Sequence, residues 1–216
     1  MDLQNWLRQK MIVPRVDAAT ALPGRDKPMF AGFPDHEIFG RPIDEVPHGC
    51  EVAYVAMGCY WGAERLFWTC PGVVNTAVGF MGGFTPNPTY RETCTGRTGH
   101  TETVQVVFDP EKLSYHDLLR LFFENHDPTQ ADRQGNDIGT QYRSAVFTTS
   151  DTQERIATGM AAAYQPELTR AGFGPITTEI APGGDFYYAE IEHQQYLHKN
   201  PQGYACDHRT GVSCPG

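Results

Sequence analysis

The spacing of apolar positions divides the chain into short strands and amphipathic helices. Runs that are apolar throughout or alternate with a period of two predict four strands, at 51–57, 73–80, 101–108 and 144–149. Apolar residues three and four apart predict a helix at 62–68 and another that begins at Ser114. The order strand, helix, strand, strand, helix, strand is that of the ferredoxin-like split βαβ fold. We therefore expect an α+β protein whose core is a ferredoxin-like two-layer α/β sandwich.

Less regular segments surround this core. A third helix is expected from the capping box of Ser150 and Gln153 to about Ala171, with a kink or break at Pro166. Further elements are expected as strands at 176–180 and 186–191 and a short helix at 193–199. Residues 1–48, rich in proline, predict an N-terminal extension that wraps the domain or is partly disordered. The α/β domain then spans 49–192, and 193–216 form a tail of the same domain, irregular from residue 200 onward.

A long polar loop separates the second and third predicted strands. Residues 81–99 are rich in Gly, Pro, Thr and Asn. About twenty residues are too many for an idle connection in a compact domain. We therefore expect this loop to carry function or to move.

Composition limits the classes of function. The 216 residues carry 17 Lys and Arg against 26 Asp and Glu, a net charge of −9, which argues against a nucleic-acid or anionic-membrane partner. No apolar run has the length of a signal peptide or a membrane span, so we expect a cytoplasmic protein. Six cysteines are too few for a scaffold built from disulfides, and in a reducing compartment free thiols are either buried or reactive.

Cys59 is the first candidate for chemistry. It lies in G-C-Y-W-G, between a predicted strand and a predicted helix. The unpaired amides of a helix start favour an anion, so a thiol there is expected to have a lowered pKa and to be partly thiolate. The alternative is a structural cysteine buried beside core aromatics.

Glu102 is the second candidate. Strand alternation places its carboxyl on the same face as Val104, Val106 and Phe108. If that face is the core, burial raises the pKa of the carboxyl and allows it to act as a general acid. The alternative is a glutamate at a strand end that reaches solvent.

Three loop residues offer further polar groups. Tyr90 and Tyr142 stand at loop ends, where their hydroxyls can reach a polar substrate, although tyrosines often serve only in packing. Asp137 can contribute to such a site or can simply bind the backbone amides of a turn.

The tail adds Cys206 and Cys214. A mobile tail can carry a thiol to an active-site sulfur, as a resolving cysteine must. The alternative is a metal site formed with His193, His198 or His208, although the Cys spacing is not that of a typical zinc site. The remaining thiols, Cys50, Cys70 and Cys94, are expected to be bystanders.

Five motifs together closely resemble the A-type peptide methionine sulfoxide reductases. They are G-C-Y-W-G at 58–62, T-P-N-P-T-Y at 85–90, T-G-R-T-G-H-T-E at 95–102, R-Q-G-N-D-I-G-T-Q-Y-R at 133–143 and Y-Y-A-E-I-E-H-Q-Q-Y-L-H-K-N-P at 187–201. The match covers about residues 50 to 216 in consistent order. The family signature is usually G-C-F-W-G, so Tyr60 replaces a Phe and adds a hydroxyl that needs a partner or solvent.

The resemblance implies a role for each candidate. Cys59 would attack the sulfoxide and Glu102 would protonate its oxygen. The other roles would be hydrogen bonding of that oxygen by Tyr90 and Tyr142, support of the site by Asp137, and contact with the substrate methyl group by Tyr60 and Trp61. The substrate would be the S epimer of methionine sulfoxide, free or in proteins, reduced without cofactor or metal by a monomer that repairs oxidised proteins.

The resemblance also implies a thiol relay. Cys59 would become a sulfenic acid, Cys206 would resolve it, and Cys214 would then be exposed to the external reductant. That reductant would be thioredoxin, or a low-molecular-weight thiol with a glutaredoxin-like partner. The tail reads G-Y-A-C-D-H-R-T-G-V-S-C where the family usually has G-Y-C-G-x-G-G-T-G-V-S-C, so Cys206 is displaced by one residue.

Two other classes of function remain open from the residues alone. One is a redox-sensing binding protein whose tail disulfide controls association with another protein. The other is a zinc-stabilised module that uses the tail thiols and histidines. Neither accounts for G-C-Y-W-G together with the strand that carries Glu102.

Overall fold

A computed structural model describes residues 15–28, 32–206 and 208–215. Its main elements follow the predicted order: β1 (Glu51–Met57), α2 (Tyr60–Trp68), β2 (Val73–Met81), β3 (Thr101–Phe108), α4 (Tyr115–Glu124) and β6 (Ser144–Thr148). The four strands lie in the sheet order β6-β1-β3-β2, and all three pairings are antiparallel. This is the ferredoxin-like arrangement, so the predicted fold class is confirmed.

Two more strands extend the sheet at its edges. β7 (Glu179–Pro182) pairs in parallel with β6, and β8 (Tyr187–Tyr188) pairs antiparallel with β2. Both are shorter than the segments predicted for them. The long helix α5 (Asp151–Arg170) ends where predicted but continues through Pro166, so the expected break is absent.

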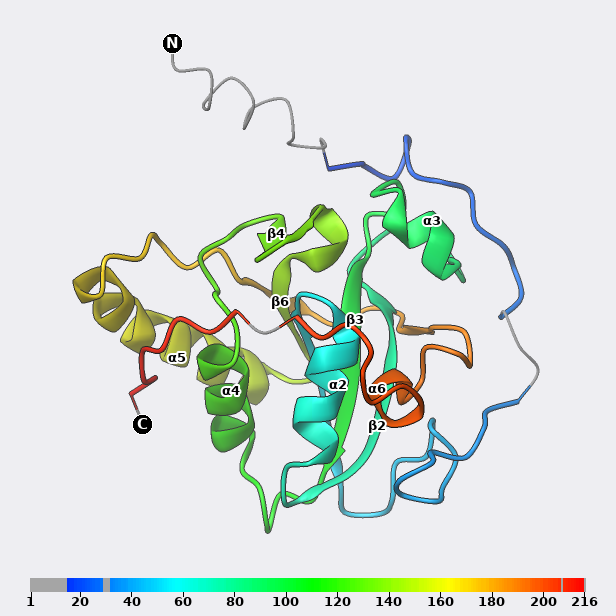
Figure 1. The fold of residues 1–216 in the computed structure, drawn as a ribbon, viewed down its shortest axis with the longest axis horizontal. Helices are drawn as coiled ribbons and strands as arrows, with labels where there is room; N and C mark the ends of the chain where they lie inside the picture. The colour runs from blue at the N-terminus through cyan, green and yellow to red at the C-terminus, as the bar shows by residue number, and fades with distance from the viewer. Residues whose placement is uncertain (1–14, 29–31, 207, 216) are drawn as a thin grey trace.

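The helices α2, α4 and α5 cover one face of the sheet (Figure 1). Their apolar stripes and the sheet residues of that face form one buried cluster, with Phe67, Leu118 and Tyr164 against Val55 and Val106. Serine caps start two of these helices as the sequence predicts, since the Asp117 amide donates to Ser114 Oγ at 3.0 Å and the Gln153 amide to Ser150 Oγ at 3.2 Å.

The two long loops contain short elements that periodicity does not predict. Within 81–99 lies α3 (Tyr90–Cys94), opened by a capping box of Thr89 and Glu92. The polar segment before β6 folds into a hairpin of β4 (Arg133–Gln134) and β5 (Asp137–Ile138), followed by a 3-10 turn, η1 (Thr140–Tyr142). These elements project from the same end of the sheet as the start of α2 (Figure 1).

The described part of the N-terminal segment, 15–28 and 32–48, runs along the outside of the domain (Figure 1). Ile43 is completely buried, and Asn75 Nδ2 of β2 donates to the carbonyls of Pro42 and Glu45 at 2.8 and 3.1 Å. Thr85 Oγ1 donates to the Leu22 carbonyl at 2.8 Å. These residues therefore wrap the domain, whereas 1–14 and 29–31 of the expected extension lie outside the described residues.

The chain ends in a short helix and an irregular tail. The helix α6 (Tyr196–Lys199) is shorter than the predicted 193–199. The tail residues 200–206 and 208–215 form neither helix nor strand, as expected, and 207 and 216 lie outside the described residues.

Candidate active site

Cys59 lies at the junction of β1 and α2, where the chain turns sharply. It is the N-cap of α2 and is 7% exposed. Gly58 before it has φ of 95°, a left-handed conformation that favours glycine. A Cβ at Gly58 would lie 2.7 Å from the Gln134 side chain, so the turn also needs glycine for space.

The electrostatic environment of Cys59 differs from the sequence-based expectation. Burial, and next the nearby Glu102 carboxyl, raise the pKa of this thiol well above its usual value, and the Trp61 amide lowers it by less. The expected lowering of the pKa by the helix start is therefore wrong, because desolvation outweighs the amides of α2. At neutral pH the resting site holds a thiol and not a thiolate.

Glu102 is buried as the strand alternation predicted. All eight residues of β3 are buried, and Glu102 lies on the face toward the helices. Its Oε2 accepts the Tyr60 amide at 2.9 Å, which places the carboxyl beside the residue that follows Cys59. Burial raises the pKa of Glu102 to about 8, so the group is mostly a neutral acid at pH 7.

Tyr90 and Tyr142, one in each of the two long loops, lie near enough to this carboxyl to feel its charge. Tyr90 opens α3, and its amide donates to Glu190 Oε1 at 3.0 Å; Tyr142 ends η1. Burial, and next the Glu102 carboxyl, raise the pKa of both phenols. Both tyrosines therefore stay neutral hydrogen-bond donors within the electrostatic reach of Glu102.

Aromatic rings form one wall of the site. The Trp61 ring stacks on Tyr196 at 3.9 Å and faces Tyr90 at 6.3 Å, and His193 packs on Tyr90 at 4.2 Å. The Tyr60 ring lies 6.3 Å from Tyr90. The Tyr60 hydroxyl is buried without a hydrogen-bond partner among the described residues, so the partner or solvent expected for it is not found there.

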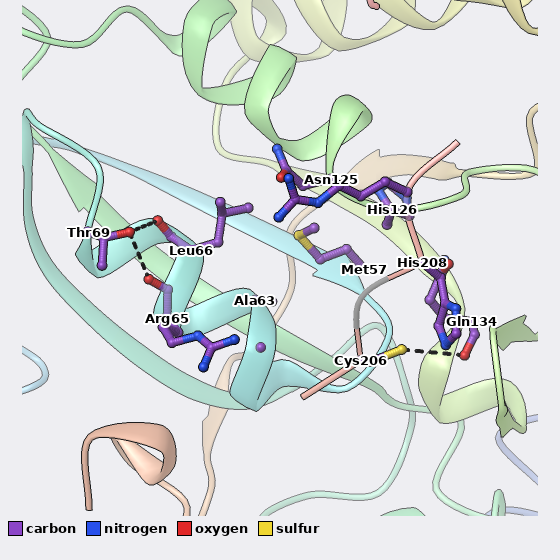
Figure 2. A pocket seen from close by; sticks show the side chains of 12 residues that line it. Met57, Ala63, Arg65, Leu66, Thr69, Asn125, His126, Gln134, Cys206 and His208 are labelled. Atoms are coloured by element: carbon purple, nitrogen blue, oxygen red, sulfur yellow. Dashed lines mark hydrogen bonds between the residues drawn. The ribbon is translucent and has the colours of Figure 1, made fainter. Parts of the chain in front are cut away.

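Cys206 lies next to the turn that carries Cys59. Its Sγ lies 3.6 Å from the Gln134 carbonyl oxygen, a contact drawn in Figure 2, and 3.8 Å from the position of a Cβ on Gly58. Burial, and then Asp137, raise the pKa of Cys206 to about 12. Asp137 on β5 accepts the Tyr204 hydroxyl at 3.1 Å, so it lies beside the tail thiol.

Cys214 lies elsewhere in the molecule. It is 5% exposed in the core cluster, and its amide donates to Glu124 Oε1 at the end of α4 at 2.9 Å. The tail nearby is held by Tyr164 of α5, whose hydroxyl donates to the Val212 carbonyl at 2.8 Å. Cys214 is thus buried at rest, because the tail packs against α4 and α5 (Figure 1), and its expected exposure to a reductant later in the relay stays a prediction.

Some residues of the site are not found by sequence reasoning. Cys94, expected to be a bystander, lies close enough to the Tyr90 side chain to contribute to the raised pKa of that phenol. Its position four residues after Tyr90 on one short helix is the signal that points to this contact. His193 and Tyr196 belong to a quoted motif, but periodicity gave them no role.

The parts of the chain that the structure describes show how the cysteines and the other potential metal ligands are arranged. No group of three or more His, Cys, Asp or Glu residues comes together there as a metal site. No described helix is both long and apolar enough to cross a membrane. All six cysteines are free thiols.

A buried thiol beside a neutral carboxylic acid, with phenol donors and a second thiol nearby, defines a cysteine-based redox site. The model of the peptide methionine sulfoxide reductase family matches residues 51–213. The MsrA protein of Salinispora arenicola is 55% identical over 212 residues, which cover 96% of this chain and 95% of that protein. The chain therefore belongs to the peptide methionine sulfoxide reductase family.

Solved structures agree with this assignment. Methionine sulfoxide reductase A of Corynebacterium diphtheriae superimposes with a TM-score of 0.86 at 50% identity, covering 94% of this chain and all of that one. Mxr1 of Saccharomyces cerevisiae in its reduced form gives a TM-score of 0.70 at 36% identity, covering 76% of this chain and 93% of that one. The ferredoxin-like core and its loops are thus an arrangement known for this family.

Proposed function

We propose that this enzyme reduces methionine sulfoxide, free or in proteins, to methionine, with Cys59 as nucleophile and Glu102 as general acid. One observation carries the assignment of these roles. The Glu102 carboxyl is buried, is neutral at pH 7 and is held by the amide that follows Cys59. A protonated carboxyl beside a thiol is what the cleavage of a sulfur–oxygen bond requires, since the leaving oxygen needs a proton.

The first step conserves charge inside the buried site. Glu102 gives its proton to the sulfoxide oxygen, and Tyr90 and Tyr142 hydrogen-bond that oxygen. Cys59 sulfur attacks the substrate sulfur, and its proton returns to Glu102, so no net charge is left in a low-dielectric site. The sulfur–oxygen bond then breaks as the hydroxyl passes to Cys59, which gives methionine and a Cys59 sulfenic acid.

Two thiols of the tail complete the cycle. The Cys206 thiol condenses with the sulfenic acid, which forms a Cys59–Cys206 disulfide and releases water. Its position beside the Cys59 turn supports this role. Cys214 attacks the Cys206 sulfur next, which restores the Cys59 thiol. Because Cys214 packs against α4 and α5 at rest, the tail must leave these helices before that exchange.

The external reductant is a dithiol protein of the thioredoxin class. Mxr1 of Saccharomyces cerevisiae has been solved in complex with Trx2, which supports this choice. A low-molecular-weight thiol with a glutaredoxin-like protein is the other route. The enzyme acts as a monomer in the cytoplasm, because one chain supplies the whole site and its six free thiols suit a reducing compartment.

The test separates the epimers of the substrate. Purified protein with dithiothreitol is expected to convert the S epimer of methionine sulfoxide to methionine and to leave the R epimer unchanged. Cys59→Ser should lose turnover, while the matched Cys50→Ser variant should keep it. Reduction of the R epimer alone, or full turnover by Cys59→Ser, contradicts the proposal.

A further inference from the structure

A second buried carboxyl lies next to the candidate active site, and no step proposed above uses it. Glu64 on α2 is completely buried. Its Oε1 accepts the Thr76 hydroxyl at 3.1 Å and the Gln195 side-chain amide at 2.9 Å, and its Oε2 accepts the Gln195 backbone amide at 2.9 Å. A buried carboxyl with three donors is a well-satisfied group that ties three segments of the chain together.

Two of these bonds hold Gln195 in an unfavourable conformation. Gln195 has φ of 47° and ψ of 40°, the left-handed region that residues with a Cβ rarely occupy. Its neighbour Gln194 is fixed to β2, since its Oε1 accepts the Val78 amide at 2.9 Å and its Nε2 donates to the Val78 carbonyl at 2.8 Å. Gln194 anchors the segment, and Glu64 determines how the backbone turns at the next residue.

The residues on either side of this pair belong to the aromatic wall. Tyr196, directly after Gln195, stacks on Trp61 with an interplanar angle of 18°. His193, just before the pair, packs on Tyr90. Trp61 and Glu64 are three residues apart on α2, so they lie on the same side of the helix. Because Gln194 anchors the segment before Gln195, a change in the backbone at Gln195 would move the Tyr196 ring relative to Trp61.

A chain of hydrogen bonds joins the N-terminal segment to Glu64, in which His36 donates to Thr76 and Thr76 donates to Glu64. His36 is completely buried, and its Nδ1 accepts the Ile38 amide at 3.1 Å. Burial lowers the pKa of His36 to about 4, so the neutral ring carries its proton on Nε2. Nε2 then donates to Thr76 Oγ1 at 2.9 Å, which leaves the Thr76 hydroxyl to donate to Glu64.

We propose that Glu64 is a positioning residue for the substrate site, which holds the Tyr196–Trp61 ring stack in place through Gln195, and that His36 and Thr76 orient it. This inference rests on the proposed function, because the rings are taken as the wall that contacts the substrate. Glu64 touches neither substrate nor the reacting sulfur. Its effect is therefore on the binding of sulfoxide and not on the chemical step.

The experiment measures the first turnover, which the recycling of thiols does not affect. Methionine formed by rapid quench at increasing sulfoxide concentration gives a half-saturating concentration and a limiting rate. Glu64→Leu removes all three bonds and is expected to raise the half-saturating concentration about 10-fold, with less than about a 2-fold change in limiting rate. Glu64→Gln keeps an oxygen for the Gln195 amide and should restore most of the wild-type value.

Two further variants separate positioning from general destabilisation. Thr76→Val removes the bridging hydroxyl and should raise the half-saturating concentration about 3-fold. Its matched control is Thr148→Val on β6, where the hydroxyl donates only to the Ala181 carbonyl and no change is expected. Thr76→Val also keeps the test valid if Glu64→Leu does not fold.

A double-mutant cycle identifies the path of the effect. If Glu64 acts through Tyr196, then Tyr196→Ala alone and Tyr196→Ala with Glu64→Leu should have equal half-saturating concentrations, because the second change has nothing left to position. Multiplicative effects, or a Thr76→Val value equal to that of Thr148→Val, would overturn the inference. Absence of sulfoxide reduction by the wild type is a different result, which refutes the proposed function itself.

Discussion

The substitution Glu102→Gln tests the central group of the proposed mechanism. It preserves the shape of the side chain and keeps an oxygen for the Tyr60 amide, but it removes the proton. Burial raises the pKa of Glu102 from 4.5 to about 8. At about 1.4 kcal/mol per pKa unit, this rise corresponds to about 5 kcal/mol between pH values well below 4.5 and well above 8.

The direction of the effect on stability follows from proton binding. Between pH 4.5 and 8 the folded protein keeps a proton on Glu102 that the unfolded chain releases. Stability due to this group is therefore complete at low pH and is lost as pH rises through this range. Glutamine cannot ionise, so the free energy of unfolding of Glu102→Gln does not fall in this pH range because of residue 102. The stability of the variant relative to wild type should increase by about 3 kcal/mol from pH 5 to pH 8.

Denaturant unfolding of both proteins at pH 5 and pH 8 measures this difference. Other buried groups with shifted pKa values, such as Glu64 and His126, are present in both proteins, so their contributions cancel. The side-chain NH2 group that glutamine introduces at position 102 has no partner there, and it lowers the stability of the variant equally at both pH values. A difference that does not change with pH would show that the Glu102 carboxyl is not held in its neutral form.

Activity provides the second measurement on the same variant. The first-turnover rate of methionine formation is expected to fall about 10²- to 10⁴-fold, the usual contribution of a positioned acid. In the wild type, loss of the acid form gives a decline with a midpoint near pH 8, and this decline should be absent from the remaining activity of the variant. An unchanged rate would remove Glu102 from the chemical step.

The remaining predictions concern the thiols and Tyr60. With a thioredoxin-class dithiol protein as the only reductant, Cys206→Ser should form one equivalent of methionine and then stop, with a Cys59 sulfenic acid that a dimedone adduct detects by mass spectrometry. Continued turnover under these conditions would exclude Cys206 as the resolving thiol. Cys214 should be alkylated more slowly in reduced native protein than after unfolding, because it is 5% exposed; equal rates would contradict its packing. Tyr60→Phe removes a buried hydroxyl that has no partner among the described residues. It should raise the free energy of unfolding by about 1–3 kcal/mol and retain activity. A lower free energy of unfolding would mean that the hydroxyl forms a hydrogen bond.

Periodicity predicts the four central strands because each has a buried face. It does not predict α3, which has five residues and is defined by the capping box of Thr89 and Glu92 and not by an apolar stripe. The β4–β5 hairpin has two residues in each strand, too few for an alternating pattern. Pro166 indicates a break, but tertiary packing of residues such as Leu168 holds the last turn of α5 in place.

The burial of a site residue could be predicted where its position in a strand determines which face of the sheet it lies on. The alternation of β3 places Glu102 on the core face, and burial then raises its pKa. The same reasoning failed for Cys59, because sequence shows that a helix begins there but not how deeply the sulfur is buried. Sequence reasoning does not predict the resting position of Cys214 either, because its contacts with Glu124 and the rest of the core depend on where an irregular tail packs.

The wrapping of the N-terminal segment makes the folding unit larger than the region that the family model matches. A chain that began at Glu51 would lose the carbonyls that satisfy Asn75 and Thr85, the buried Ile43 side chain and the imidazole that bonds Thr76. Each lost hydrogen bond is worth about 0.5–1.5 kcal/mol and the burial of an isoleucine side chain about 1.5–3 kcal/mol, which together are a large part of the stability of a single domain. Residues 15–28 and 32–50 thus contribute little to the chemistry but a substantial share of the cooperativity with which the domain folds.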